Sequence, residues 1–198
     1  MPRFADHAQR RREIAYAVWY VIATQGFDAV TMRAVAAEAD ISVGRIQHYF
    51  ASKDEMVRAA CLEMITLAAD RYAARVGDRP AVEALEVLIL STIPENDDAR
   101  IGTAVWYAFL ARSIAEPEIA TIMRDAQAGL ESEVVRLLVA AAENGDLVPT
   151  SADPTTARRL IALSDGLTQR VLIGALSADS AIEVLRAEVG RLARLDEG

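Results

Sequence analysis

Residues 42–49, read as SVGRIQHY, gather side chains that can contact nucleic acid. Arg45, Gln47, His48 and Tyr49 lie within five positions of one another. An arginine can donate two hydrogen bonds to guanine, and a glutamine can pair with adenine or bind a phosphate. Histidine and tyrosine can donate to phosphate or pack on a thymine methyl group. Gly44 has no Cβ, so the backbone could approach DNA closely there. The segment therefore indicates a DNA-reading helix.

The neighbouring sequence predicts how such a helix is held. Ile46 and Phe50 are four residues apart, so they can pack inward and leave the polar and aromatic side chains on the surface. Thr31 is a suitable N-cap for a short helix over residues 32–39, and Ser42 caps the next helix after a tight connection. Two short helices joined in this way are typical of a helix-turn-helix DNA reader.

The first helix is expected from about Ala5 to Gln25, with Asp6 as its N-cap and Gly26 as its stop. Its apolar positions recur at helical spacing. They are Ile14, Val18, Val21 and Ile22, and Val35 and Ala36 are expected to face them from the second helix.

The remainder of the chain also reads as helical. Ser52 and Glu55 form a capping box that starts a fourth helix, which runs to about Val76. Residues 94–100 are expected to be a loop, and Ser180 with Glu183 to cap the last helix. The later helices are expected over residues 80–93, 101–114, 117–144, 154–174 and 180–195. The sequence therefore predicts an all-α fold of about nine helices.

The charge is distributed unevenly along the chain. The net charge is −8, which by itself argues against nucleic acid as a partner. Residues 1–58, however, carry eight basic and seven acidic side chains, whereas residues 59–198 carry 13 and 22. Arg10, Arg11 and Arg12 form a basic cluster near the start of the chain. An acidic protein can still present one basic face to DNA.

Several classes of protein are excluded or disfavoured. The single cysteine, Cys61, cannot form an internal disulfide, and we expect it to be a buried apolar residue. There are two histidines and no catalytic, phosphate-binding or dinucleotide motif, so an enzyme is not expected, nor is a metal or a cofactor. The apolar run after Arg12 is interrupted at Glu13 and is too short to span a bilayer, so we expect a cytoplasmic protein without membrane contact.

Residues 10–57 resemble the DNA-binding domain of TetR-family transcriptional regulators. The resemblance rests on an ordered set of features: Gly26-Phe27, Thr31-Met32-Arg33, Ala36, Ala39, Ile41-Ser42, Tyr49-Phe50 and Ser52-Lys53. It implies an N-terminal three-helix DNA-binding domain over residues 1–53. It also implies a helical effector-binding and dimerisation domain over residues 54–198.

The resemblance assigns a set of residues to the DNA surface. They are Arg33, Val43, Gly44, Arg45, Gln47, His48, Tyr49 and Lys53, and the caps Thr31 and Ser42 add phosphate-binding helix starts. Arg45 and Gln47 are the candidates for reading bases, and Thr31, Tyr49 and Lys53 for holding phosphates.

Three of these assignments leave alternatives open. Gly44 departs from the proline or larger residue that the family often carries, and Val43 could belong either to the core or to a thymine contact. Lys53 could be an ordinary solvated charge, but a cation at a helix start is unfavourable without a nearby anion.

The C-terminal part is similar to the subgroup related to the choline-responsive regulator BetI. The similarity covers the pattern from Trp106 to Leu110, Gly145-Asp146-Leu147, Asp153-Pro154 and Asp165-Gly166-Leu167. It implies that the last two helices pair with their copies in a homodimer. The expected dimer contacts are Leu160, Leu163, Leu167, Val171 and Leu172.

An effector pocket is expected between the fourth and eighth helices. Its candidate lining residues are Met64, Leu67, Ala68, Tyr72, Trp106, Phe109, Met123, Gln127 and Asp165. Methionines and aromatic residues at helical spacing also fit an ordinary core. A carboxylate in an apolar run needs a partner, which for Asp165 is either a structural arginine or a ligand that carries a cation or a hydrogen-bond donor.

The expected function is a homodimeric repressor that a small-molecule inducer, of unknown identity, releases from a palindromic double-stranded operator. The alternative is a transcriptional activator, or a sensor of the same fold that acts through a protein partner.

Overall fold

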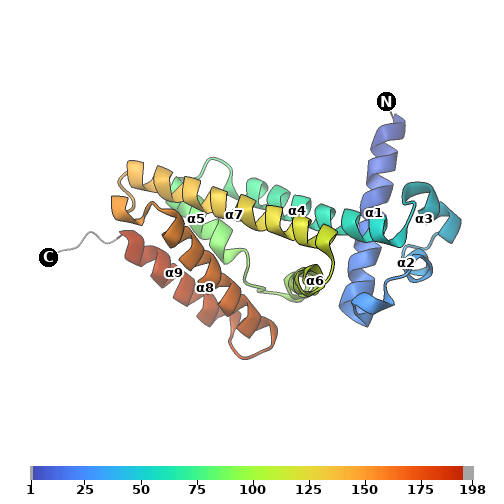
Figure 1. Cartoon of the computed structure of the whole chain (residues 1–198). Helices are drawn as coiled ribbons and strands as arrows, with labels where there is room; N and C mark the ends of the chain where they lie inside the picture. The colour runs from blue at the N-terminus through green and yellow to red at the C-terminus, as the bar shows by residue number, and fades with distance from the viewer. Residues whose placement is uncertain (1, 194–198) are drawn as a thin grey trace. The chain divides into compact units, whose positions relative to one another are not determined.

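The computed structural model describes the backbone of residues 2–193 and the side chains of residues 7–193, and within these limits every regular element is helical (Figure 1). The long helices are α1 (Pro2–Gln25), α4 (Lys53–Val76), α5 (Ala81–Leu90), α6 (Asp97–Ser113), α7 (Pro117–Glu143), α8 (Pro154–Leu172) and α9 (Ala178–Ala193). The short ones are α2 (Met32–Glu38), α3 (Val43–Tyr49) and the 3₁₀ turns η1 (Phe27–Ala29) and η2 (Pro149–Ser151). The prediction of an all-α fold with about nine helices is confirmed.

The chain forms two compact units. The N-terminal unit comprises Met1–Ala68 and Ala104–Arg124, and the C-terminal unit comprises Ala69–Thr103 and Asp125–Gly198. Each unit has its own buried apolar cluster. No helix within residues 2–193 is long and apolar enough to cross a membrane.

The core of the N-terminal unit is built on the apolar face of α1. Ile14, Val18 and Val21 are each no more than 1 % exposed, and they belong to the same cluster as Ile46 and Phe50. Ile22, Val35 and Ala36 are also buried there. The predicted inward residues of the first three helices are therefore confirmed. A short helix such as α3 has little stability of its own, so this packing holds it in place.

Side-chain caps fix where α2, α3 and α4 begin. The hydroxyl of Thr31 accepts from the amide of Ala34 at 3.0 Å, and that of Ser42 accepts from the amide of Arg45 at 3.1 Å. Ser52 Oγ accepts from the amide of Glu55, at 3.1 Å. These three caps are where the sequence predicts them.

Four predicted helix limits need correction. The first helix begins at Pro2, so Asp6 lies inside it and is not its N-cap. Helix α5 ends at Leu90, three residues before its predicted end. Residues 97–100 of the predicted loop are helical because Asn96 Oδ1 caps the amide of Ala99 at 2.9 Å. The last helix begins earlier than predicted because Ser177 Oγ, not Ser180, accepts the capping bond, from the amide of Ser180 at 3.2 Å.

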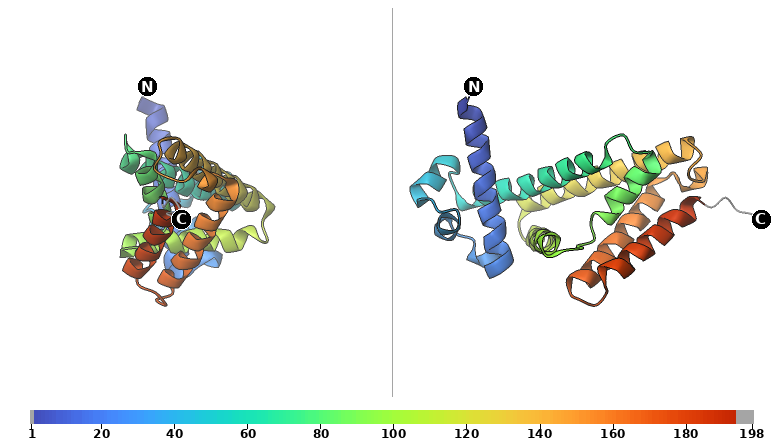
Figure 2. Two further views of the ribbon diagram at one scale, coloured as in Figure 1. Left: turned by 90° about the vertical axis from the view of Figure 1, so that its left-hand side faces the viewer. Right: turned by 180° about the vertical axis from the view of Figure 1, so that it is seen from behind.

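In the C-terminal unit, α8 and α9 run antiparallel and are joined by a turn at Gly174 (Figure 2). The φ of Gly174 is 76°, a conformation that favours glycine. Their inward residues pack with α5 and the second half of α7 in one cluster. The buried members from α8 and α9 are Ala157, Leu160, Leu167, Val171, Ala181, Leu185 and Val189.

This packing bears on the predicted dimer contacts of α8, because three of the five are buried within the chain itself. Leu160, Leu167 and Val171 are buried within their own chain, at 1 %, 8 % and 3 % exposure. Side chains already buried in the cluster have little surface left for a partner subunit. Leu163 and Leu172 are partly exposed and keep some surface available.

Candidate nucleic-acid interface

The turn between α2 and α3 sets the direction of the reading helix. Helix α2 ends at Glu38, and the amide of Ile41 then donates to the carbonyl of Ala36 at 3.0 Å. Asp40 makes this turn with a φ of 51°, a left-handed conformation that aspartate tolerates better than most residues. The Ser42 cap follows at once, so α3 begins one short turn after α2 ends.

The outer surface of α3 is polar. Gly44, Arg45, Gln47 and His48 are exposed, while Val43 is half-buried. Thr31, Arg33 and Ser42 are exposed on the neighbouring segments, and Lys53, at the start of α4, is half-buried. The sequence prediction that α3 carries its polar residues outward is confirmed for Arg45, Gln47 and His48.

The prediction for Tyr49 is wrong as regards exposure. Its side chain is only 8 % exposed and belongs to the apolar cluster of the N-terminal unit. Its ring lies 4.8 Å from the ring of His7 and 5.2 Å from that of His48, measured between centroids. The ring packs inward because residue 49 follows Ile46 by three positions and so shares its face of the helix.

Three cations near α3 are left without acidic partners. Within the described residues, the side chains of Arg33, Arg45 and Lys53 form no ion pair or hydrogen bond. Most other arginines of the N-terminal unit are paired: Arg10 with Glu13, Arg11 with Glu55, Arg12 with Glu63, Arg58 with Glu118, and Arg112 with Asp28 and Glu116. These three side chains, like the unpaired Arg124 of the same unit, are available to an external anion.

The basic cluster predicted at residues 10–12 is therefore largely neutralised. Arg10 and Arg12 each bind a glutamate at 2.6 Å, and Arg11 is turned toward α3. Arg11 donates to the backbone carbonyl of Tyr49, 38 positions later in the chain. No local spacing in the sequence could reveal this contact.

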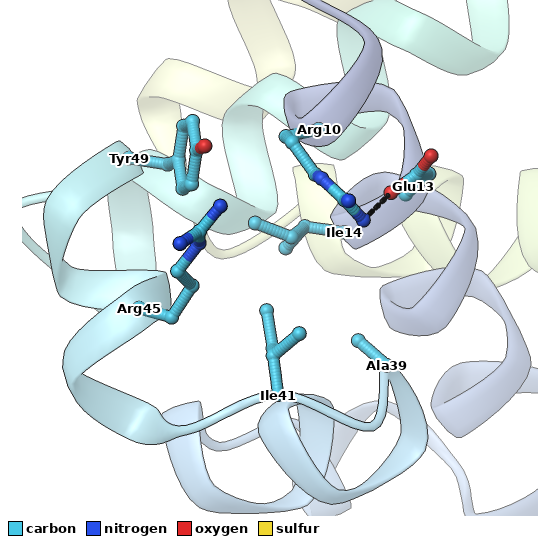
Figure 3. A pocket seen from close by; sticks show the side chains of 7 residues that line it. All are labelled: Arg10, Glu13, Ile14, Ala39, Ile41, Arg45 and Tyr49. Atoms are coloured by element: carbon cyan, nitrogen blue, oxygen red, sulfur yellow. Dashed lines mark hydrogen bonds and ion pairs between the residues drawn. The ribbon is translucent and has the colours of Figure 1, made fainter. Parts of the chain in front are cut away.

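A small cavity lies beside the candidate reading residue Arg45 (Figure 3). The side chains of Arg45 and Tyr49 extend from α3 toward α1, where Arg10 pairs with Glu13. Ile14, Ala39 and Ile41 complete its lining. Its volume is about 20 Å³, which is enough for a single water molecule and too small for an organic effector.

The predicted effector residues are divided between the two units. In the N-terminal unit, Phe109 and Met123 are buried at 0 % and 3 % exposure, which identifies them as core residues. Met64, Leu67 and Trp106 are half-buried there, and Ala68 is exposed. In the C-terminal unit Tyr72, Gln127 and Asp165 are half-buried.

Cys61 also lies in the core of the N-terminal unit, as predicted. Its thiol donates to the sulfur of Met123 at 3.8 Å, and burial raises the pKa of the thiol to about 12. Cys61 is therefore a packing residue with little thiolate at neutral pH.

A polar network that the sequence did not predict surrounds Tyr72. The Tyr72 hydroxyl donates to Glu133 Oε1 at 3.2 Å, and Arg136 donates to both oxygens of Glu133, at 2.8 and 2.7 Å. Burial, followed by the charge of Glu133, raises the pKa of Tyr72 to about 12. The bond from Arg136 lowers the pKa of Glu133. Burial raises the pKa of the Asp165 carboxyl.

The comparisons with known proteins agree with this arrangement. Residues 19–60 match the model for bacterial regulatory proteins of the tetR family, and residues 80–194 match the model for the C-terminal domain of BetI-type transcriptional repressors. The HTH-type transcriptional regulator PksA of Bacillus subtilis is 32 % identical, over 87 % of this chain and 83 % of PksA. The regulator BetI of Stenotrophomonas maltophilia is 31 % identical, over 86 % of this chain and 85 % of BetI.

A solved structure with a similar fold comes from Saccharomonospora viridis. It is described as a transcriptional regulator in complex with choline, and it is 26 % identical with a TM-score of 0.83. The match covers 92 % of this chain and 96 % of that one.

Proposed function

The chain belongs to the TetR family of bacterial transcriptional regulators, with a C-terminal domain of the BetI type, and we propose that it is a homodimeric repressor of a palindromic operator. It is a DNA-binding regulator and not an enzyme. We propose that residues 1–53 read the operator and that residues 54–198 bind the effector and the second subunit. Bacterial operators lie in the cytoplasm, so we place the protein there.

The observation that carries the proposal is the set of unpaired cations around the exposed face of α3. Arg33, Arg45 and Lys53 have no acidic partner among the described residues, although the chain as a whole has an excess of eight negative charges. Cations without internal partners are available to bind phosphate or a base edge. Other arginines of the chain are also unpaired, but these three lie on or beside the exposed helix of a helix-turn-helix, and that placement supports DNA as the partner.

We propose different roles in DNA binding for the exposed side chains of α3 and its neighbours. Arg45 and Gln47 are exposed on α3 and are proposed to read base edges in the major groove, with His48, Val43 and Gly44 against the bases or the backbone. Arg33, Lys53 and the capped helix starts at Thr31 and Ser42 are proposed to hold phosphates. Tyr49 can take part only through its hydroxyl, since its ring is buried.

We propose that the dimer forms through the outward faces of α8 and α9. Ala162 and Gly166 lie on the exposed face of α8, Ile173 is the exposed residue that follows its C-terminal end, and Val184 and Ala187 are exposed on α9. Ile173 is 78 % exposed and Val184 is 44 % exposed. A Cβ added at Gly166 would meet no atom within 4 Å, so this face is open to a partner helix. A two-fold dimer presents two readers to a palindrome.

We propose that a small molecule relieves repression, and that Asp165 contributes to its recognition. The carboxylate of Asp165 is half-buried on α8, and a carboxylate can bind a cation or a hydrogen-bond donor of a ligand. A regulator of similar fold binds choline, which makes choline the first compound to test. Calorimetry with choline on the wild type and on Asp165→Asn tests the assignment, and equal binding by both would contradict it. Binding that weakens in acid, as the carboxylate takes up a proton, is also expected.

Selection from a random duplex library tests the reading of DNA. Purified protein should recover a palindrome, bind it with a steep salt dependence, and lose about 1–3 kcal/mol of binding free energy on Arg45→Ala. Arg58→Ala is the matched control, because Arg58 also lies in the N-terminal unit but is paired with Glu118. A selected pool without a common sequence, or an Arg45→Ala variant that binds as the wild type does, would contradict the proposal.

The sign of regulation needs a separate measurement. A reporter gene placed behind the selected operator should be silenced by the protein and restored by its effector. Increased expression on adding the protein would instead identify an activator.

A further inference from the structure

Arg11 makes three contacts that converge on the C-terminal end of α3. Its Nη1 donates to the carbonyl of Tyr49 at 2.5 Å, its guanidinium lies 4.2 Å from the centroid of the Phe50 ring, and its Nη1 lies 3.6 Å from Glu55 Oε1. We infer that Arg11 is a positioning residue for DNA reading, which fixes the end of α3 against α1 and the start of α4. The inference rests on the proposed function, because it assumes that α3 reads the operator.

The bond to Tyr49 meets a general need of helix ends. The last carbonyls of a helix have no partner within the helix, and the negative end of its dipole favours a cation. Tyr49 is the last residue of α3, and Phe50 after it is extended, with a φ of −140°. The guanidinium of Arg11 supplies both the donor and the charge at this point, so it acts as a cap contributed by another helix.

The contacts with Phe50 and Glu55 extend this cap to the next helix. A guanidinium over an aromatic face gains cation–π attraction, and the Phe50 ring is itself buried. Glu55 Oε2 accepts from the amide of Ala51 at 2.8 Å, which holds the short link between α3 and α4. Arg11 therefore joins three segments whose relative placement decides where the side chains of α3 point.

A direct contact of Arg11 with DNA is a different role, and the geometry disfavours it. The Arg11 side chain is 34 % exposed, and its guanidinium is already used by a carbonyl, a ring and a carboxylate. Arg12, the next residue, is 46 % exposed and binds only Glu63. Arg12→Ala removes the same charge from the same helix and leaves the α3 contacts intact, which makes it the matched control.

The test compares the full-length wild type with Arg11→Ala, Arg11→Lys, Arg12→Ala and Arg45→Ala. Each protein is titrated with the selected operator duplex and with a scrambled duplex of the same length and composition, over a series of salt concentrations. Circular dichroism and the melting temperature show whether each variant is folded. The deciding quantity is the ratio of affinities for operator and scrambled duplex, because partial unfolding lowers both affinities equally and leaves the ratio unchanged.

We expect Arg11→Ala to lower this ratio by about tenfold relative to Arg12→Ala, the factor that corresponds to about 1.4 kcal/mol. Affinity for the scrambled duplex and the salt slope should match those of Arg12→Ala. Arg11→Lys keeps the charge but not the planar fork that bonds and stacks at once, so it should lower the ratio severalfold. If Arg11→Ala does not fold, the ratio of operator to scrambled affinity in Arg11→Lys tests the inference instead.

Two results would overturn the inference. One is an unchanged ratio in Arg11→Ala and Arg11→Lys. The other is an equal loss on both duplexes, with the salt slope reduced by about 1 and restored in Arg11→Lys, which identifies a phosphate contact. The Arg45→Ala variant distinguishes failure of the proposed function from failure of the positioning role alone. If it too leaves the ratio unchanged, α3 is not the reader and the proposed function fails; if only the Arg11 variants do, the positioning role alone fails.

Discussion

Helices α3 and α8 both mix polar and apolar residues, but only α8 buries hydroxyl side chains on its packed face. In α3, Ile46 is buried while Arg45 and Gln47 are exposed. In α8, Ser164 and Thr168 are 1 % and 4 % exposed, whereas Arg158, Arg159 and Arg170 are exposed.

The reason for this difference is whether a neighbouring segment of the chain can bond the polar groups. Ser164 and Thr92 place their hydroxyl oxygens 2.5 Å apart, and Thr168 donates to the carbonyl of Thr92 at 3.3 Å. Buried hydroxyl groups cost little when they are bonded in this way. The guanidinium of Arg45 has no such partner among the described residues, so it remains at the surface. A polar residue on an amphipathic helix can therefore serve packing or recognition, and its surroundings decide which.

The largest expected effect, on dimerisation and operator affinity, comes from a substitution on the outward face of α8. Gly166→Glu places a charge at the centre of the proposed dimer face, so we expect a monomer whose operator affinity is lower by about 100-fold, because binding through two linked readers is lost. Sedimentation and operator titration measure the two effects. Gly129→Glu is the control, since Gly129 is also an exposed helical glycine with open space around it. A Gly166→Glu dimer that still binds the operator would move the interface elsewhere.

The predictions for α8 differ from the structure because packing between distant segments decides which of its side chains are buried. The caps at Thr31, Ser42 and Ser52 were predictable because a cap depends on a residue three positions away. Which face of α8 packs against α5 depends on residues about 70 positions apart, so Leu160 and Leu167 were expected as dimer contacts although they are buried within their own chain. Tyr49 failed for a related reason, because its burial depends on α1.

The second prediction concerns the cations around α3. Lys53→Ala removes a charge without an internal partner, so we expect the slope of log affinity against log salt to fall in magnitude by about 1 for operator and scrambled duplex alike. Arg58→Ala removes a charge paired with Glu118 and should leave the slope unchanged. Equal slopes in the two variants would remove the distinction between paired and unpaired cations.

The buried hydroxyl groups of α8 should affect stability and not DNA reading. Ser164→Ala leaves Thr92 without one of its partners, so we expect the free energy of unfolding to fall by about 1 kcal/mol, measured by urea titration. Ser132→Ala is the control, because Ser132 is exposed and bonds only the carbonyl of Ala128 in its own helix. A change in operator specificity in Ser164→Ala would show that α8 does more than pack.

The smallest expected effect is the pH dependence contributed by Tyr72. Its pKa is raised from 10.0 to about 12, first by burial and then by the charge of Glu133, so the folded state holds the phenol proton more tightly than the unfolded state. The contribution of protonated Tyr72 to the stability of the folded state is complete below pH 10 and is lost as the pH rises toward 12. Tyr72→Phe removes this contribution, so the stability difference between variant and wild type should narrow over that interval.

Ultraviolet titration supplies an independent measurement of the same group. The Tyr72→Phe variant should lack one late-ionising phenol among the five tyrosines of the chain. Titration curves that differ at lower pH instead would mean that Glu133 does not hold the Tyr72 hydroxyl. The polar network of the C-terminal unit would then be open to solvent, as the side chains of α3 are, and the contrast between the two regions would not extend beyond Ser164 and Thr168.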